Sequence, residues 1–258
     1  MHDERIRKAF TQQAPALSVA PAFHAEDILL AIREGLAGDG RGRLLDAGCG
    51  PGVVLAAVGA DFAEVCGLDL TPAMVERAKV ACQEAGLAEA HLKVGSMLAM
   101  PFDDGHFDAV VSRLTLHHLE APGDALREMA RVLRPGGTLV IADLLGCKDP
   151  AEAALQDALE ILRDPSHVRL LPEAEVREFF TRAGLSQQSF QRIHKRRSFA
   201  EWASIVDAPE RTEPLLLAMR TLAEAGCGQG IELAMDGDQP TFLHRWAIWT
   251  LRKEGSKT

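Results

Sequence analysis

The stretch Leu44-Leu45-Asp46-Ala47-Gly48-Cys49-Gly50-Pro51-Gly52 decides the fold, because it leads an apolar run through an acidic residue into three alternating glycines. A second apolar run follows directly at residues 53–58 and has the character of a helix. Each glycine removes a Cβ where the backbone turns with unusual φ or where a ligand comes close. The stretch therefore predicts a buried strand, a ligand-binding loop and a helix, in that order.

Length and composition indicate one large α/β core. The chain has 258 residues, 47% of them hydrophobic, which favours a single domain over two independent ones. Its 28 basic and 37 acidic residues give a net charge of −9, which disfavours a nucleic-acid partner. The basic run Lys195-Arg196-Arg197 is short and is read as a solvated strand end rather than as a phosphate site.

Cysteine spacing and hydropathy bear on location. The five cysteines stand far apart at 49, 66, 82, 147 and 227, which indicates neither a disulfide framework nor a metal site. No apolar stretch approaches the ~20 residues of a membrane span. We therefore expect a cytoplasmic protein without membrane insertion and without a metal. The chain has no Tyr, which excludes a phenolic acid or base.

Strand and helix patterns alternate along the first part of the chain, which predicts a parallel sheet with both faces covered. Thr71 is expected to cap a helix that has Pro72 at its first position. The predicted strands are 44–47, 64–70, 91–94, 107–112, 138–142, 186–194 and 242–251, and the predicted helices are 23–36, 72–86, 122–133, 150–162 and 173–183.

The domain organisation follows from the segments outside this alternation. Residues 1–22 are expected to form an N-terminal arm or lid, or else a frayed terminus. Residues 23–258 form one domain, into which two cap segments are inserted at about 145–171 and 198–240. These insertions are placed to cover the strand ends.

Asp69 ends the second predicted strand and suits a nucleoside ligand. Because ligands of doubly wound sheets bind at the carboxyl ends of strands, Asp69 and the glycine loop should face one cleft. A carboxylate there can accept hydrogen bonds from a ribose diol, or it can cap the following helix. The pyrophosphate fingerprint G-x-G-x-x-G is absent, since Val53 stands at its sixth position. The pattern thus disfavours NAD.

Several motifs in order resemble class I S-adenosylmethionine-dependent methyltransferases, of the ubiquinone and menaquinone biosynthesis group and its small-molecule relatives. The resemblance rests on Leu45-Asp46-Ala47-Gly48-Cys49-Gly50-Pro51-Gly52, Gly67-Leu68-Asp69, Met100-Pro101-Phe102, Phe107-Asp108, His117-His118-Leu119 and Leu133-Arg134-Pro135-Gly136-Gly137. It implies a seven-stranded, mostly parallel, doubly wound (Rossmann-like) sheet with an antiparallel last hairpin and helical cap insertions.

The resemblance also implies a cofactor site for S-adenosyl-L-methionine. Asp46 would receive the ammonium group and Asp69 the ribose, while Ser96 replaces the acidic residue that relatives place near the adenine. Met74 and Met97 would contact the adenine or serve as core residues. The full set assigned to the cofactor is Asp46, Gly48, Cys49, Gly50, Gly52, Asp69, Leu70, Met74, Ser96, Met97 and Arg113.

Two neighbouring histidines are the candidates for catalysis. His118, followed by His117, would act as a base on a hydroxyl or an acidic carbon, or would make a structural hydrogen bond. In the cap, the candidates for substrate binding are His167, Arg169 and Trp202, whose alternative roles are loop-fixing hydrogen bonds and cap core.

The sequence therefore predicts methyl transfer from S-adenosylmethionine to a small apolar or aromatic metabolite, at an oxygen, carbon or nitrogen atom. In-line displacement of this kind depends mainly on alignment and exclusion of water. Two alternatives remain: an enzyme of the same fold that cleaves or cyclises the cofactor, and a cofactor-binding module without catalysis.

Overall fold

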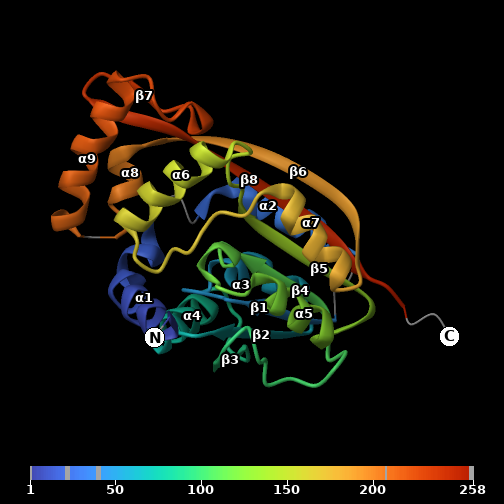
Figure 1. The fold of residues 1–258 in the computed structure, drawn as a ribbon. Helices are drawn as coiled ribbons and strands as arrows, with labels where there is room; N and C mark the ends of the chain where they lie inside the picture. The colour runs from blue at the N-terminus through green and yellow to red at the C-terminus, as the bar shows by residue number, and fades with distance from the viewer. Residues whose placement is uncertain (1, 21–23, 39–41, 207, 256–258) are drawn as a thin grey trace.

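The computed structural model describes residues 2–20, 24–38, 42–206 and 208–255, and Figure 1 shows its layered α/β arrangement. Helices are α1 (His2–Val19), α2 (Glu26–Leu36), α3 (Val53–Val58), α4 (Pro72–Glu84), α5 (Pro122–Val132), α6 (Pro150–Arg163), α7 (Glu173–Arg182), α8 (Phe199–Ala203) and α9 (Pro209–Glu224), with short 3-10 turns η2 (Gly59–Asp61), η3 (Leu116–His118) and η4 (Gln229–Ile231). Strands are β1 (Arg43–Ala47), β2 (Glu64–Asp69), β3 (His91–Val94), β4 (Phe107–Arg113), β5 (Leu133–Leu144), β6 (Leu185–Ser198), β7 (Ala234–Asp236) and β8 (Gln239–Lys253).

One sheet organises the molecule, in the strand order β3-β2-β1-β4-β5-β8-β6. The first five strands are parallel, and β8 runs antiparallel to both β5 and β6. The predicted mostly parallel sheet with an antiparallel last hairpin is confirmed. The short strand β7, which pairs with β8, adds an eighth member that the sequence patterns did not indicate.

Side chains on successive strand residues point to opposite faces, so that two hydrophobic clusters enclose the sheet. On one face Leu45 and Val110 pack with residues of α5 and α7, including Leu126 and Phe180. On the other face the neighbouring strand residues pack against α2, α3 and α4. Continuous burial on both faces explains why the central strands read as unbroken apolar runs.

The cap segments have an apolar core of their own, in which Trp202 of α8 packs with Met219 of α9 and Phe242 of β8. Helix α1 packs against α4 and reaches the cap, since Leu17, Met74 and Ile205 lie in one cluster. Figure 1 shows α1, α8 and α9 gathered near the same end of the sheet. No helix in the described ranges has the length and apolarity needed to cross a bilayer.

Two local expectations differ from the structure. The Thr71 side chain makes no capping hydrogen bond to α4. The Thr71 backbone N–H donates to Asp69 Oδ1 at 2.8 Å. Helix α2 begins at Glu26 rather than at Phe23, and Phe23 lies outside the described residues.

Candidate active site

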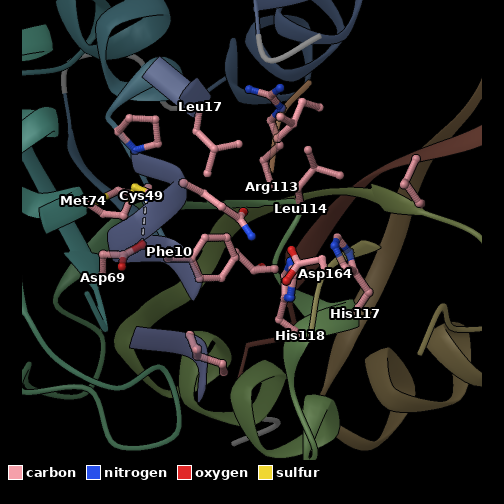
Figure 2. A pocket seen from close by; sticks show the side chains of 18 of the residues that line it. Phe10, Leu17, Cys49, Asp69, Met74, Arg113, Leu114, His117, His118 and Asp164 are labelled. Carbon is pink, nitrogen blue, oxygen red and sulfur yellow. Dashed lines mark hydrogen bonds between the residues drawn. The ribbon is translucent and has the colours of Figure 1, made fainter. Parts of the chain in front are cut away.

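A cavity of about 430 Å³ opens at the carboxyl ends of β1, β2 and β4, and α1, the cap and β8 complete its walls. Asp46 and Asp69 both line it, as expected of two strand-end carboxylates. Figure 2 shows Asp69 and Met74 on one side of this cavity, His117 and His118 on the other, and Phe10 between them. Of the predicted residues, those that line the cavity are Asp46, Gly48, Cys49, Gly50, Asp69, Leu70, Met74, Ser96, Met97, Arg113, His117, His118 and Trp202.

The glycines of the loop after β1 meet three different demands. All of them have a positive φ angle, which residues with a Cβ atom rarely adopt. A Cβ on Gly48 would overlap the Thr115 side chain, and one on Gly52 would come within 2.8 Å of the Ala78 Cα in α4. A Cβ on Gly50 would meet nothing within 4 Å. Gly50 therefore presents bare backbone to the cavity, whereas Gly52 allows close packing of two helices and does not line the cavity.

Asp46 is a buried carboxylate at the end of β1 whose Oδ2 atom has no hydrogen-bond partner among the described residues. Burial raises its pKa to about 7, against the opposing effect of the Arg113 guanidinium. Buried polar atoms without partners are rare in folded proteins. Asp46 therefore offers an acceptor that a cationic or hydrogen-bonding ligand group would satisfy.

Asp69 is held by backbone N–H groups on both of its oxygen atoms. Gly50 N–H donates to Oδ2 at 2.9 Å and Thr71 N–H donates to Oδ1 at 2.8 Å. Burial raises the Asp69 pKa in spite of these two hydrogen bonds. The contacts tie β2 to the glycine loop, and they leave each oxygen with further lone pairs for a ligand.

His117 forms a buried pair with Asp143, a residue near the end of β5 that sequence reasoning missed. The distance from His117 Nδ1 to Asp143 Oδ1 is 2.6 Å, and the backbone N–H of Leu116 donates to Asp143 Oδ2 at 2.8 Å. Burial alone would lower the His117 pKa, but the adjacent carboxylate outweighs burial and raises it. Asp143 therefore holds both the η3 turn and its first histidine.

His118 takes part in a second hydrogen-bonded chain. Its Nδ1 atom lies 3.1 Å from Ser166 Oγ, and Ser166 Oγ donates to Asp164 Oδ1 at 2.6 Å. Burial, reinforced by the neighbouring His117, lowers the His118 pKa to about 3. The His118 ring also contacts the Phe10 ring edge-on, with centroids 4.9 Å apart. His118 is consequently a neutral imidazole held from two sides.

Two of the predicted substrate-binding residues do not reach the cavity. His167 Nε2 lies 3.0 Å from Asp157 Oδ1, and Arg169 makes a two-pronged ion pair with Glu175. Neither side chain lines the cavity, so the structure corrects their placement: both make the loop-fixing contacts that the sequence left as the alternative. Trp202 does line the cavity, although it is also part of the cap core.

Several cavity residues come from segments far apart in the chain and carried no motif. Trp246 of β8 faces the cavity, while the Arg113 guanidinium lies over its ring, 5.7 Å from the centroid. Arg163 lies over Trp202 in the same way, at 4.8 Å. Ile6, Phe10, Gln13 and Leu17 of α1 close the cavity on another side. Residues 1–22 were expected to form an arm or lid, and the alternation of His244 and Trp246 was a signal in the sequence of β8.

Comparisons with known proteins bear on the family of the chain. A methyltransferase-domain family model matches residues 45–141, from β1 to β5. The uncharacterized methyltransferase YcgJ of Bacillus subtilis is 31% identical over 175 residues, which are 68% of this chain and 69% of that protein. Its crystal structure superposes with a TM-score of 0.81 at 26% identity, covering 90% of this chain and 100% of that one.

Two other similar proteins are named by their activity. A malonyl-[acyl-carrier protein] O-methyltransferase of Dechloromonas aromatica is 28% identical over 240 residues, 87% of this chain and 86% of that protein. The [4+2]-cyclase SpnF shares the fold, with a TM-score of 0.64 and 22% identity over 89% of this chain and 82% of that one. The YcgJ relative and the matched methyltransferase domain show that the chain belongs to the S-adenosylmethionine-dependent methyltransferase family.

Proposed function

We propose that the protein binds S-adenosylmethionine in the cavity and transfers its methyl group to a small metabolite. The observation that carries this proposal is the buried Asp46 Oδ2 atom, which has no partner among the described residues and lies at the glycine loop. An ammonium group of the cofactor would satisfy it. The same charge would favour the ionised form of Asp46 and so lower its raised pKa.

The residues present fit the remaining parts of the cofactor. Gly50 offers backbone without a side chain, and Asp69 offers oxygen lone pairs for a ribose. Leu70 and Met74 supply an apolar wall for the adenine, and Ser96 lies along the same cavity. Once bound, S-adenosylmethionine supplies an electrophilic methyl group, while the protein aligns the acceptor and excludes water.

The acceptor is small and at least partly apolar. A volume of about 430 Å³ is typical of small-molecule sites, and the cofactor takes part of it. The remaining wall carries the aromatic side chains Phe10, Trp202 and Trp246 beside His117 and His118. The O-methyltransferase activity in the name of the Dechloromonas relative supports an oxygen acceptor.

Titration calorimetry with S-adenosylhomocysteine, the demethylated cofactor, tests the first step. We expect saturable binding to the wild type and weakened binding to Asp46→Asn, because the amide carries no charge to pair with the ammonium group. Asp61→Asn is the matched control, since Asp61 lies on η2 outside the cavity. If neither S-adenosylhomocysteine nor S-adenosylmethionine binds, the proposal is contradicted.

Product analysis separates methyl transfer from the alternatives. Incubation with S-adenosylmethionine carrying a labelled methyl group and a panel of aromatic acceptors should move the label to an acceptor. Release of a cleavage product from the cofactor without any acceptor would instead favour an enzyme that breaks or cyclises the cofactor.

A further inference from the structure

We propose that Arg197, supported by the charge of Arg163, forms an anion subsite in the β6 wall of the cavity, and that the methyl acceptor is a carboxylic acid whose charged end lies there, away from the methylated atom. The inference rests on the proposed function of the cavity, since it names the substrate class of that same site. It starts from the basic run Lys195-Arg196-Arg197, for which the sequence predicts a solvated strand end.

The sheet topology carries this run to the cavity. Strand β8 is antiparallel to both β5 and β6, so β6 runs in the same direction as β5 and its last residues lie at the carboxyl edge of the sheet. There Lys195 lies opposite His244 of β8, and Arg197 lies opposite Phe242. All three residues of the basic run line the cavity, as does His244. The run is therefore part of the cavity wall rather than a fully solvated strand end.

Two members of the run are paired with carboxylates of other segments. Lys195 makes an ion pair with Asp27 of α2. Arg196 donates from Nη2 to Glu232 Oε2 at 2.9 Å and from Nη1 to the Glu232 carbonyl oxygen at 3.2 Å. These contacts neutralise two of the three cations of the run, and they direct attention to the third.

Arg197 is a buried cation that its surroundings do not fully compensate. Its side chain is 12% exposed, and its Nη1 atom lies 2.9 Å from Glu201 Oε1 in α8. The Arg197 Nε atom is buried and has no hydrogen-bond partner among the described residues. Burial, together with the charge of Arg163, lowers the Arg197 pKa in spite of Glu201 and Glu160. The nearby carboxylates thus do not offset the cost of burying this cation, and a further anion at Arg197 would reduce that cost.

Arg163 of α6 is a second cation in this part of the cavity, and protein groups hold its terminal nitrogen atoms. Nη2 donates to Glu160 Oε2 at 3.0 Å, and Nη1 donates to the carbonyl oxygen of Trp202 at 3.3 Å. Glu160 is shared, since His244 Nε2 lies 3.2 Å from its Oε1 atom. Arg163 is therefore fixed and repels Arg197, and a ligand carboxylate at Arg197 would relieve this repulsion.

The apolar part of the same wall suits the body of such an acid. Trp202 and Ile205 line the cavity just after the end of β6, and Trp246 lines it from β8. Tryptophan side chains pack well against aromatic or aliphatic groups. A guanidinium group binds a carboxylate through two parallel hydrogen bonds, which are strong where water is excluded. An acid with an apolar body would satisfy both the cation and the walls around it.

Sheet geometry separates the charged end of the acid from the cofactor. The glycine loop follows β1, and β6 lies at the opposite side of the sheet, beyond β4, β5 and β8. Because neighbouring strands are about 4.8 Å apart, the main chain of β6 lies roughly 14 Å from that of β4 and farther still from β1. The carboxylate at Arg197 is therefore at the other end of the acceptor from the atom that receives the methyl group.

The carboxylates nearby favour a ligand with one negative charge over a ligand with two. Glu201 pairs with Arg197, and both Glu201 and Asp164 line the cavity. A phosphate monoester carries nearly two negative charges at pH 7, so these groups would repel it more strongly than they repel a carboxylate. The subsite is accordingly suited to a monoanion.

Paired ligands that differ in one group test the subsite. Cinnamate and cinnamamide have the same body and nearly the same shape, but only cinnamate is charged. Calorimetry on the protein saturated with S-adenosylhomocysteine measures the Kd of each. We expect the wild type to bind cinnamate about tenfold more tightly, because the amide forms no charged hydrogen bonds with Arg197. Arg197→Gln should remove the preference, and Arg197→Lys should keep part of it, since lysine retains the charge without the planar fork.

Arg192→Gln is the matched control. Arg192 lies on the same strand, pairs with Glu173 and does not line the cavity, so this variant should keep the wild-type preference. Equal binding of cinnamate and cinnamamide by the wild type, or no binding of cinnamate at millimolar concentration, would overturn the subsite. A preference that persists in Arg197→Gln would assign it to another residue. Tighter binding of cinnamyl phosphate than of cinnamate would rule out the choice of a monoanion.

These outcomes are distinct from failure of the proposed function. Binding of S-adenosylhomocysteine is measured first, and its absence contradicts the cofactor site itself. Binding of S-adenosylhomocysteine without any preference for cinnamate leaves the cofactor site intact and excludes only the acid. The same titrations without S-adenosylhomocysteine test the subsite even if the cofactor does not bind, and the wild-type comparison does not depend on any variant being folded.

Discussion

The two ends of the cavity are built in different ways. At the glycine-loop end, backbone N–H groups of Gly50 and Thr71 hold Asp69. At the cap end, each histidine depends on another side chain, His117 on Asp143 and His118 on Ser166. The first end is positioned by the path of the main chain and the second by hydrogen bonds between side chains. Substitutions should therefore act on binding and stability at one end and on turnover at the other.

The largest effect is expected at the cap end, from His118→Gln. Loss of the base that the sequence assigns to His118 should lower kcat by about 10²- to 10⁴-fold, the usual contribution of a general base. Initial rates with a hydroxylated acceptor measure kcat, and calorimetry with S-adenosylhomocysteine should show unchanged affinity. A parallel loss of affinity would mean that the two ends are not separable.

Two glycine variants test the glycine-loop end through the stability of the protein. Gly48→Ala is expected to lower the free energy of unfolding by roughly 2–4 kcal/mol, because its Cβ would overlap Thr115 at positive φ. Gly50→Ala has the same backbone strain but open space, so it should cost only about 1 kcal/mol. Urea unfolding measures the free energy of unfolding of both variants. Equal losses would show that backbone strain, and not the contact with Thr115, determines the destabilisation.

Asp69→Ala should act on binding more than on turnover. The variant loses the acceptor for two backbone N–H groups and for the ribose, which should raise the Kd for S-adenosylhomocysteine roughly 10- to 100-fold. Asp61→Ala is the control, since its carboxylate pairs with Arg33 outside the cavity. An unchanged Kd would leave Asp69 with a purely structural role.

Asp46 gives the glycine-loop end a pH dependence. Burial raises its pKa from 3.8 to about 7, so the folded protein binds more protons than the unfolded chain between these values. Stability should thus fall as pH rises, by about 2 kcal/mol between pH 5 and 6.5 relative to Asp46→Asn, which cannot titrate. Urea unfolding of both proteins across this range measures the difference, which saturating S-adenosylhomocysteine should reduce.

The smallest effect is expected from Arg169→Ala. Its ion pair with Glu175 is partly exposed, and such pairs contribute about 0–1 kcal/mol. Because Arg169 does not line the cavity, its loss should change kcat and KM by less than about twofold. A marked rise in KM for the acceptor would show that Arg169 contributes to acceptor binding after all.

The strand-end carboxylates could be predicted because their position follows from local pattern. Asp46 and Asp69 each end an apolar strand, and parallel strands bring such ends to one edge. The loop after α6 has no such periodicity. The sequence analysis chose His167 and Arg169 in this loop as substrate-binding residues because their side chains are polar or charged. In the structure, Asp164 and Ser166 are the residues that interact with His118. Which side chains of an irregular loop turn inward depends on tertiary packing.

The same distinction holds for the fold. Helices and strands of the alternating part were predicted with ends close to those observed, since burial imposes a period on each of them. The exception is β5, which begins at Leu133 rather than at Thr138. The strand β7 was missed because three residues, Ala234–Asp236, are too few for alternation to show. The capping role expected of the Thr71 side chain was wrong, since this side chain accepts no hydrogen bond from the first turn of α4.

The last strand has a consequence for how the protein is made. Along β8, Trp249 fills the core while His244 and Trp246 face the cavity. On the ribosome the glycine loop emerges long before this strand. A nascent chain therefore contains the residues of the glycine-loop end of the cavity well before it contains Trp246 of β8. The cavity cannot close until β8 slots between β5 and β6. Premature termination would thus leave a chain with a nucleoside loop but without an acceptor wall.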